Sequence, residues 1–397
     1  MIKISEYAQR IEESATMAIS ARAKAMKKAG EDVVAMAAGE PDFDTPAHIV
    51  AAAKQALDEG FTRYTPASGM PELRAAWAEQ VARSRGVNYE PNQLMVTAGG
   101  KQAIYNIVYA LAGPGDEVLI PAPYWVSYPE QVRAVGATPI ILETSAEQDF
   151  KVSPDALRQA ITNRTRLIIL NSPSNPTGSV YNRDELTALA EVLVEQQVPV
   201  LSDEVYDALV YGEEFASIAS LGKEIYDLTI VSGAVSKTYA MTGWRIGYAV
   251  GPAEVIAAAG RLQSHSTSGA NSAAQKGALA AITGDQSAVE TMRQEFDRRR
   301  QYMLQRLSAM PDITCPEPHG AFYTFPHVSA YFGRRPNGEV VDGSMAFSGL
   351  FLEHEKVATV PGLAFGDDGH VRLSYATGMA QIEEAMDRME RFLSRLA

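Results

Sequence analysis

Short apolar runs alternate with predicted helices through the middle of the chain. The runs fall at residues 94–97, 118–120, 139–142, 167–170, 198–201, 228–231 and 244–250. Such runs, separated by stretches with helical spacing, are typical of a mostly parallel sheet covered by helices on both faces. The pattern therefore predicts an α/β domain, which we place at residues 48–285.

The two ends of the chain show a different pattern. The predicted elements are a helix at residues 14–29 capped by Ser14, a strand at 33–37, a charged helix at 287–309, strands around 322–325 and 371–375, and a last amphipathic helix containing residues 382–396. We interpret the charge run of residues 287–309 as a solvated face. These segments predict a smaller α+β domain at residues 286–397, and residues 1–47 supply an N-terminal arm and part of that domain.

The composition and net charge of the chain limit its kinds of partner and its location. The chain has 397 residues, of which 46% are hydrophobic and 21% charged, and its net charge is −13. This charge argues against nucleic acid or an anionic membrane as a partner. No run of apolar residues is long enough to span a bilayer, and no signal peptide is visible. We therefore expect a cytoplasmic protein, or an organelle protein whose targeting segment has been removed.

Metal and disulfide chemistry find little support in the sequence. The single cysteine, Cys315, excludes a disulfide within the chain. The six histidines show no ligand spacing, so we predict no metal site. Any anionic ligand must be bound by local arginines and lysines.

Polar residues follow the predicted strands, where open α/β sheets bind their ligands. Gly100 and Lys101 open a helix after the first strand, and helix N-termini bind anions, although a plain tight turn would look the same. Trp125 follows the next strand and suits either packing or a stacked ring. Asn175 lies in the rigid loop Asn-Ser-Pro-Ser-Asn-Pro-Thr-Gly of residues 171–178, which favours a functional role.

A lysine, an arginine and an acid complete this group. Lys237 lies between short hydroxyl residues and apolar strands, where loss of solvation would lower its pKa and produce a nucleophilic amine. Arg245, at the mouth of the next strand, suits a phosphate. An ordinary surface lysine and salt bridge is the alternative. Asp203 ends a buried strand and needs a cationic partner, for which Lys237, Arg245 and a protonated heteroaromatic nitrogen are candidates.

Pyridoxal 5′-phosphate needs all of these groups together. Its aldehyde needs a lysine, its phosphate needs arginine and helix amides, its ring needs a stacking partner, and its pyridine nitrogen needs a carboxylate. The sequence therefore predicts this cofactor.

The motifs resemble those of the fold-type I pyridoxal-phosphate aminotransferases, in particular the bacterial aspartate aminotransferase branch of class I. They are AGEPDFDTP, YTPASG, NSPSNPTG, SDEVY, SKTYAMTGWRIGY and HVRLSYA, and they span essentially the whole chain. The resemblance implies a large domain with a mostly parallel seven-stranded sheet, a smaller α+β domain, and a homodimer with its active site at the subunit interface.

The same resemblance implies roles for individual residues. Lys237 matches the lysine that forms a Schiff base with the cofactor and moves the substrate proton, and Asp203 matches the acid at the pyridine nitrogen. Asn175 and Tyr206 match the donors to the phenolic oxygen. The other matches are Trp125 on the ring, Gly100, Lys101, Ser236 and Arg245 at the phosphate, Tyr64 reaching the phosphate from the partner subunit, and Arg372 with Gly39 at the substrate α-carboxylate, where Trp125 and Asn175 also lie.

The implied activity is ping-pong transamination of aspartate and 2-oxoglutarate to oxaloacetate and glutamate. Residues 263–271 hold no arginine for a second substrate carboxylate, and Glu12 stands where prephenate-using relatives carry a lysine. The alternatives are an aminotransferase for aromatic amino acids, alanine, kynurenine or prephenate, and a β-lyase. A ligand-sensing regulator is disfavoured because the fold begins almost at residue 1, and a nicotinamide oxidoreductase because no G-x-G-x-x-G motif follows a predicted strand.

Overall fold

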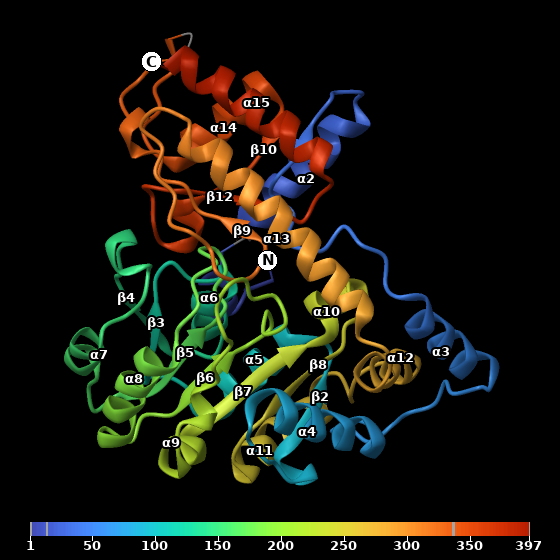
Figure 1. The fold of residues 1–397 in the computed structure, drawn as a ribbon. Helices are drawn as coiled ribbons and strands as arrows, with labels where there is room; N and C mark the ends of the chain where they lie inside the picture. The colour runs from blue at the N-terminus through green and yellow to red at the C-terminus, as the bar shows by residue number, and fades with distance from the viewer. Residues whose placement is uncertain (1, 13–14, 336–337, 397) are drawn as a thin grey trace.

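A seven-stranded sheet with helices on both faces forms the larger part of the molecule (Figure 1). A computed structural model describes residues 2–12, 15–335 and 338–396. The strands in spatial order are β2 (Leu94–Thr97), β8 (Gly247–Val250), β7 (Thr229–Ala234), β6 (Val200–Asp203), β5 (Thr165–Asn171), β3 (Glu117–Pro121) and β4 (Thr138–Leu142). Only β8 runs antiparallel to its neighbours, so the prediction of a mostly parallel α/β sheet is confirmed.

The central strands are apolar on both faces, as the continuous runs in the sequence predicted. In β5, Leu167 and Ile169 pack into one hydrophobic cluster while Ile168 and Leu170 pack into another. Successive side chains of a strand point to opposite faces, so a strand covered on both sides needs an unbroken apolar run. The helices that supply this cover are α3 (Ala47–Asp58), α4 (Pro71–Arg85), α5 (Gly100–Leu111), α6 (Ser127–Ala134), α7 (Pro154–Ala160), α8 (Arg183–Glu195), α9 (Lys223–Leu228), α11 (Ala253–Ser266) and α12 (Ser272–Thr283).

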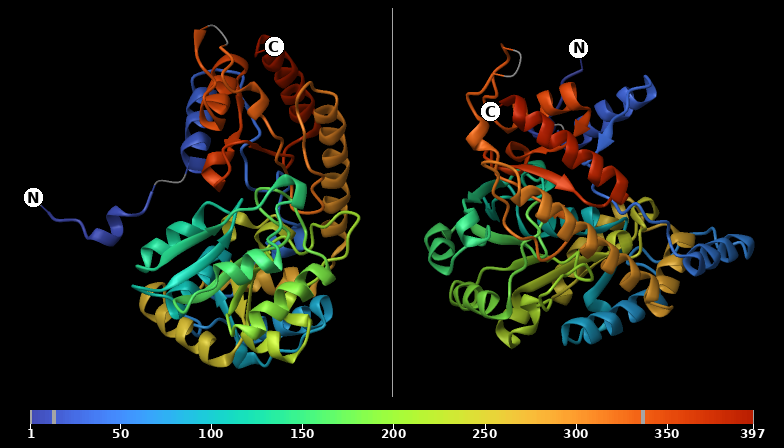
Figure 2. Two further views of the ribbon diagram at one scale, coloured as in Figure 1. Left: turned by 90° about the vertical axis from the view of Figure 1, so that its left-hand side faces the viewer. Right: turned by 45° about the horizontal axis from the view of Figure 1, so that its top comes forward.

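The C-terminal elements form a second group above the sheet, and α2 lies beside them in both views of Figure 2. The elements of this group are α2 (Ala15–Lys28), β1 (Val34–Ala35), α13 (Ser287–Ser308), β9 (Tyr323–Thr324), α14 (Ser344–Glu355), β10 (Val357–Ala358), β11 (Val360–Pro361), β12 (Val371–Ser374) and α15 (Met379–Leu396). β1 pairs in parallel with β10, so the N-terminal segment does join the C-terminal elements. The domain boundaries at residues 47 and 285 remain a prediction.

Two expectations from the sequence are wrong. The last strand of the large sheet begins at Gly247, because residues 242–244 form a 3₁₀ turn and Arg245 takes a left-handed conformation with φ 58°. In α13, Arg299 and Arg300 are buried instead of lying on a solvated face. Arg299 pairs with Asp42, which is remote in sequence, so helical spacing alone could not reveal this burial. The predicted cap Ser14 lies outside the described residues.

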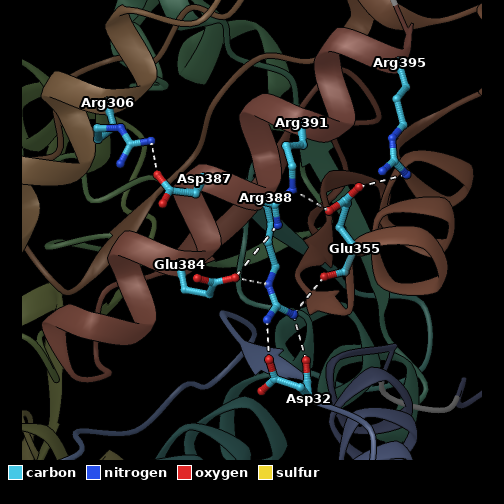
Figure 3. A network of polar contacts seen from close by, with 8 residues as sticks. All are labelled: Asp32, Arg306, Glu355, Glu384, Asp387, Arg388, Arg391 and Arg395. Carbon is cyan, nitrogen blue, oxygen red and sulfur yellow. Dashed lines mark hydrogen bonds and ion pairs between the residues drawn. The ribbon is translucent and has the colours of Figure 1, made fainter.

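A network of ion pairs ties the N-terminal segment to the C-terminal helices (Figure 3). Arg388 on α15 is only 10% exposed, and it pairs with Asp32 and with Glu384, whose Oε1 lies 2.7 Å from Nε. Its Nη1 also donates to the backbone carbonyls of Asp32 at 2.7 Å and Glu355 at 3.0 Å. One guanidinium therefore holds three segments that are far apart in the chain.

None of the described helices is long and apolar enough to cross a membrane.

Replacing Arg388 should destabilise the protein. Arg388→Met removes the donor to two backbone carbonyls and two carboxylates, which is expected to lower the free energy of unfolding by about 2–4 kcal/mol. Arg395→Met is the matched control, because Arg395 is 52% exposed and, among the described residues, forms an ion pair with Glu355 alone; its expected loss is below about 1 kcal/mol. Urea unfolding followed by circular dichroism measures both, and equal losses would contradict the central role of Arg388.

Candidate active site

The side chain of Lys237 lies at the carboxyl end of β7, which points toward the C-terminal elements (Figure 1). The strand runs directly into the short helix α10 (Val235–Thr238), which carries the lysine. Its Nζ donates a hydrogen bond to the carbonyl of Gly39 and lies 5.7 Å from the centre of the Phe322 ring. Burial lowers the pKa of Lys237 to about 8, and the nearby cations Arg372 and Arg245 act in the same direction. The surroundings of this amine agree with the desolvation expected from the sequence, and its chemical role remains a prediction.

The carboxylate of Asp203 lies at the end of the adjacent strand, β6, and its residue is 4% exposed. Its Oδ2 accepts a hydrogen bond from the Tyr128 hydroxyl at 2.6 Å, and its Oδ1 accepts one from the Val205 N–H at 3.3 Å. Burial raises the pKa of Asp203 to about 6. No lysine or arginine of the described chain lies within 4.0 Å of this carboxylate. Of the three candidate partners, Lys237 and Arg245 therefore do not pair with Asp203 directly.

Arg372, on β12, is a buried cation that, like the Asp203 carboxylate, has no ion-pair partner among the described residues. Its Nη1 donates to Oδ1 of Asn175 at 2.8 Å and its Nη2 to the carbonyl of Ala37 at 3.0 Å. Its Nε is buried and has no hydrogen-bond partner, and no carboxylate of the described residues lies within 4.0 Å. Burial lowers the pKa of Arg372, so this guanidinium pays a desolvation cost that an anionic ligand would relieve.

Two tyrosine hydroxyls meet beside Arg372. The hydroxyls of Tyr206 and Tyr323 are 2.9 Å apart, and the Arg372 guanidinium carbon lies 4.3 Å from the centre of the Tyr323 ring. A Cβ atom at Gly39 would lie 3.4 Å from the Tyr323 hydroxyl, so glycine keeps this space open. Because Oδ1 of Asn175 already accepts from Arg372, the amide NH₂ of Asn175 is left to donate elsewhere.

A cradle for an anion lies at the N-terminus of α5. Gly99 has φ +84°, and an ideal Cβ there would lie 2.6 Å from Nη2 of Arg245. Gly247 approaches so closely that its Cβ would lie 2.4 Å from the backbone nitrogen of Gly100. The first N–H groups of α5 have no acceptor within the helix. The buried Oγ of Ser232, on β7, has no hydrogen-bond partner, and Ser236 is buried nearby in sequence on α10.

Comparison with known proteins identifies the family. The sequence profile described as "Aminotransferase class I and II" matches residues 31–389. The chain belongs to this family. It is 46% identical to the aspartate aminotransferase of Geobacillus stearothermophilus and 45% identical to the aspartate/prephenate aminotransferase of Cereibacter sphaeroides, with 100% of each chain covered in both cases.

Solved aminotransferase structures share the fold. The aspartate aminotransferase of Rhizobium meliloti superimposes with a TM-score of 0.97 at 40% identity and covers 100% of both chains. The aspartate aminotransferase of Thermus thermophilus with maleate gives a TM-score of 0.93 at 41% identity over 98% of this chain and 100% of that chain. The fold-type I architecture predicted from the motifs is thus confirmed for this aminotransferase.

Lys101 and Trp125 lie together at the mouth of the site. Nζ of Lys101 is 4.8 Å from the centre of the Trp125 ring, and burial together with Arg245 lowers the pKa of Lys101. The Trp125 ring also meets the ring of Tyr128 edge-on, with centroids 5.4 Å apart. The assignment of Lys101 to a phosphate site and of Trp125 to a stacked ring remains a prediction.

Tyr64, which the sequence predicts to act from the partner subunit, lies almost fully in solvent. The residue is 94% exposed, so its own chain gives its side chain almost no contact.

Three residues of the site were missed by sequence reasoning: Tyr128, Tyr323 and Ser232. Tyr128 follows Trp125 by three residues, which is a signal that helical spacing could have provided. Tyr323 and Ser232 carry no such signal, because their importance depends on contacts across the fold.

In the aminotransferase without cofactor, Lys237 should be an unusually acidic lysine. Competitive labelling of its amines with acetic anhydride across a range of pH is expected to give Lys237 a midpoint near pH 8, because burial disfavours the ammonium form. The same chain unfolded in urea is the control, and there the midpoint should rise to the ordinary value of about 10.4. A midpoint unchanged by unfolding would contradict the desolvation of Lys237.

Proposed function

We propose that this chain is a pyridoxal-phosphate-dependent aspartate aminotransferase that transfers the amino group to 2-oxoglutarate by a ping-pong mechanism. The observation that carries the proposal is the pair of buried charges Asp203 and Arg372, neither of which has a counter-ion among the described residues. A buried charge without a partner is costly, so each calls for a charge of opposite sign from a ligand. An amino acid bound to pyridoxal phosphate supplies both.

The chemistry of the site fits this cofactor. Asp203 would hold its pyridine nitrogen, the amine of Lys237 would bind its aldehyde, and the amides of Gly100 and Lys101 with Arg245 would hold its phosphate. When bound, the cofactor supplies an electron sink that makes the α-proton of an amino acid removable. The unpartnered Oγ of Ser232 and the space between Gly99 and Arg245 are consistent with a ligand that donates and accepts hydrogen bonds at this end of the site.

The residues of the chain then have separate tasks. Lys237, whose pKa is lowered to about 8, holds a neutral amine in about a tenth of the molecules at pH 7, far more than an ordinary lysine would, and this amine can take a proton from the substrate Cα. Tyr206 and the amide NH₂ of Asn175 are the donors available for the phenolic oxygen. Arg372 would bind the α-carboxylate in two parallel hydrogen bonds, with Gly39 leaving room beside it.

Relatives support aspartate as the amino donor. Those from Geobacillus stearothermophilus and Bacillus subtilis, 46% and 44% identical, are named aspartate aminotransferases, and the Thermus thermophilus structure contains maleate, a dicarboxylate. Prephenate is a second candidate amino acceptor, because the relative from Cereibacter sphaeroides is named for both substrates. Glu12 stands where the resemblance places a lysine in prephenate-using relatives. Its N–H donates to Oε2 of Glu130, on α6, at 2.9 Å.

The proposed enzyme is a homodimer in which each subunit completes the site of the other. Tyr64 supports this arrangement because its side chain is 94% exposed and therefore available for contact with a partner subunit. A hydroxyl from the partner subunit at the cofactor phosphate would add one charge-assisted hydrogen bond.

Aspartate and 2-oxoglutarate should react to give oxaloacetate and glutamate when the purified protein is supplied with pyridoxal phosphate. Oxaloacetate formation from aspartate can be followed with malate dehydrogenase and NADH. For a panel of other amino acids, and for glutamate with prephenate as acceptor, the oxo acid formed from each donor can be measured by chromatography. Lys237→Ala is expected to abolish turnover and the borohydride fixation of cofactor to this residue. Release of pyruvate and ammonia would indicate a β-lyase, and full activity of Lys237→Ala would refute the role of the lysine.

Arg372 should govern binding of the α-carboxylate. Arg372→Leu is expected to raise KM for aspartate at least about tenfold, since hydrogen bonds to a charged group contribute about 1.5–3 kcal/mol each. Arg372→Lys keeps the charge but loses the planar pair of donors, so its KM for aspartate should lie between those of the unaltered enzyme and Arg372→Leu. An unchanged KM in Arg372→Leu would place the α-carboxylate elsewhere. The affinity for pyridoxal phosphate, measured by absorbance titration, should stay within about threefold.

A further inference from the structure

The loop that carries Tyr64, residues 61–70, is held from beneath by two buried glutamines. Gln275 on α12 is 0% exposed, and all of its amide groups bond. Its Nε2 donates to Oγ1 of Thr65 and to the carbonyl of Ala270, both at 2.9 Å, and its Oε1 accepts from the N–H of Met70 at 2.8 Å. One side chain therefore fixes the loop at two points, Thr65 and Met70, both of which follow Tyr64 in the chain.

Gln263 on α11 is the second of these residues and is also 0% exposed. Its Nε2 donates to the carbonyl of Ala67 at 2.6 Å and to the carbonyl of Val96 at 2.7 Å, and its Oε1 accepts from Nδ2 of Asn106 at 3.2 Å. Val96 belongs to β2, the strand that leads to the Gly100 cradle. The loop is thus tied to the frame of the large sheet.

Further contacts leave the loop little freedom. The N–H of Val96 donates to the carbonyl of Ser68 at 2.9 Å, and Oγ of Ser272 donates to the carbonyl of Phe61 at 3.0 Å. At Gly69, where φ is +95°, a Cβ would lie 2.3 Å from the side chain of Val96, so only glycine allows this approach. A turn that only connected α3 to α4 would not need its backbone fixed at so many points.

The side chain of Tyr64 itself is free, so its position depends on this backbone. Polar side chains are rarely buried among apolar residues unless all their hydrogen bonds are made, and Gln275 lies beside Ala274 and Ala278 of an apolar cluster. We propose that Gln263 and Gln275 are positioning residues that hold Tyr64 where it can reach the cofactor phosphate of the partner subunit. This inference rests on the proposed function, in which Tyr64 acts across the dimer.

Affinity for pyridoxal phosphate in single and double variants tests the inference. Tyr64→Phe is expected to weaken binding about tenfold, the worth of one hydrogen bond to a charged group. Gln275→Met should weaken it by a similar factor, and Tyr64→Phe with Gln275→Met should be no weaker than either alone, because both remove the same bond. If the losses of affinity in the two single variants multiply in the double variant, the inference is overturned. So would a Gln275→Met variant that binds as tightly as the unaltered protein.

Thr65→Val provides a test that does not depend on changing the buried glutamine. It keeps the shape of a partly exposed side chain and removes one of the two acceptors for Nε2 of Gln275, the one that lies in the loop. Binding of pyridoxal phosphate should weaken at least about threefold, again only when Tyr64 is present. Gln301→Met, an exposed glutamine on α13, is the control and should bind as the unaltered chain does. A loss in Thr65→Val that persists in the Tyr64→Phe background would contradict the positioning role.

Mixed dimers assign the effect to the correct subunit. When a Lys237→Ala chain is paired with a Gln275→Met chain, the one remaining Lys237 receives Tyr64 from a chain with an intact glutamine, so cofactor fixed there by borohydride should show normal affinity. When Lys237→Ala and Gln275→Met are on one chain and its partner is unaltered, the affinity should be weak. The reverse order would overturn the inference. Failure of the proposed function is distinguishable, because the unaltered protein would then bind no pyridoxal phosphate at all.

Discussion

The uncompensated carboxylate of Asp203 at the end of β6 is the constraint on which the rest of the site depends. Its neighbour Glu204 is equally buried but points to the other side of the chain, where Oε2 pairs with Nε of Arg85 and Oε1 accepts from Ser202 at 2.9 Å and Ser217 at 2.6 Å. Two adjacent acids thus meet opposite conditions. Glu204 is fully satisfied and anchors the strand end to α4, while Asp203 has only the donors Tyr128 and Val205 and needs a cation from a ligand.

Arg372 extends the same argument to the C-terminal elements. It lies on β12, far from β6 in sequence, and it reaches Asn175 at one side and the carbonyl of Ala37 at the other. A buried guanidinium and a buried carboxylate that face the same space would pair directly if they were close enough, yet the described chain keeps them apart.

Local patterns predicted the strands and most of the site because parallel strands deliver their carboxyl ends to one edge. Asn175, Asp203 and Lys237 each lie at or after the end of an apolar run. Once those runs form neighbouring parallel strands, the three residues lie at the same edge of the sheet. The failures concern contacts between distant segments. Burial of Arg299 depends on Asp42, and the hydroxyl pair of Tyr206 and Tyr323 exists only once β9 is placed over the sheet. The start of β8 was missed because Arg245 takes a left-handed conformation, which its sequence context does not signal.

Desolvation shifts the pKa values of Lys237 and Asp203 toward each other, to about 8 and about 6. Both shifts disfavour the charged form of the group, and both therefore oppose folding near neutral pH, where the unfolded chain would carry both charges at no such cost. A cation at Asp203 would lower its pKa again and keep the carboxylate ionised, whereas covalent use of the Lys237 amine would remove its charge altogether. A bound cofactor would relieve both costs at once, so the same burial that opposes folding of the chain alone favours binding of the cofactor.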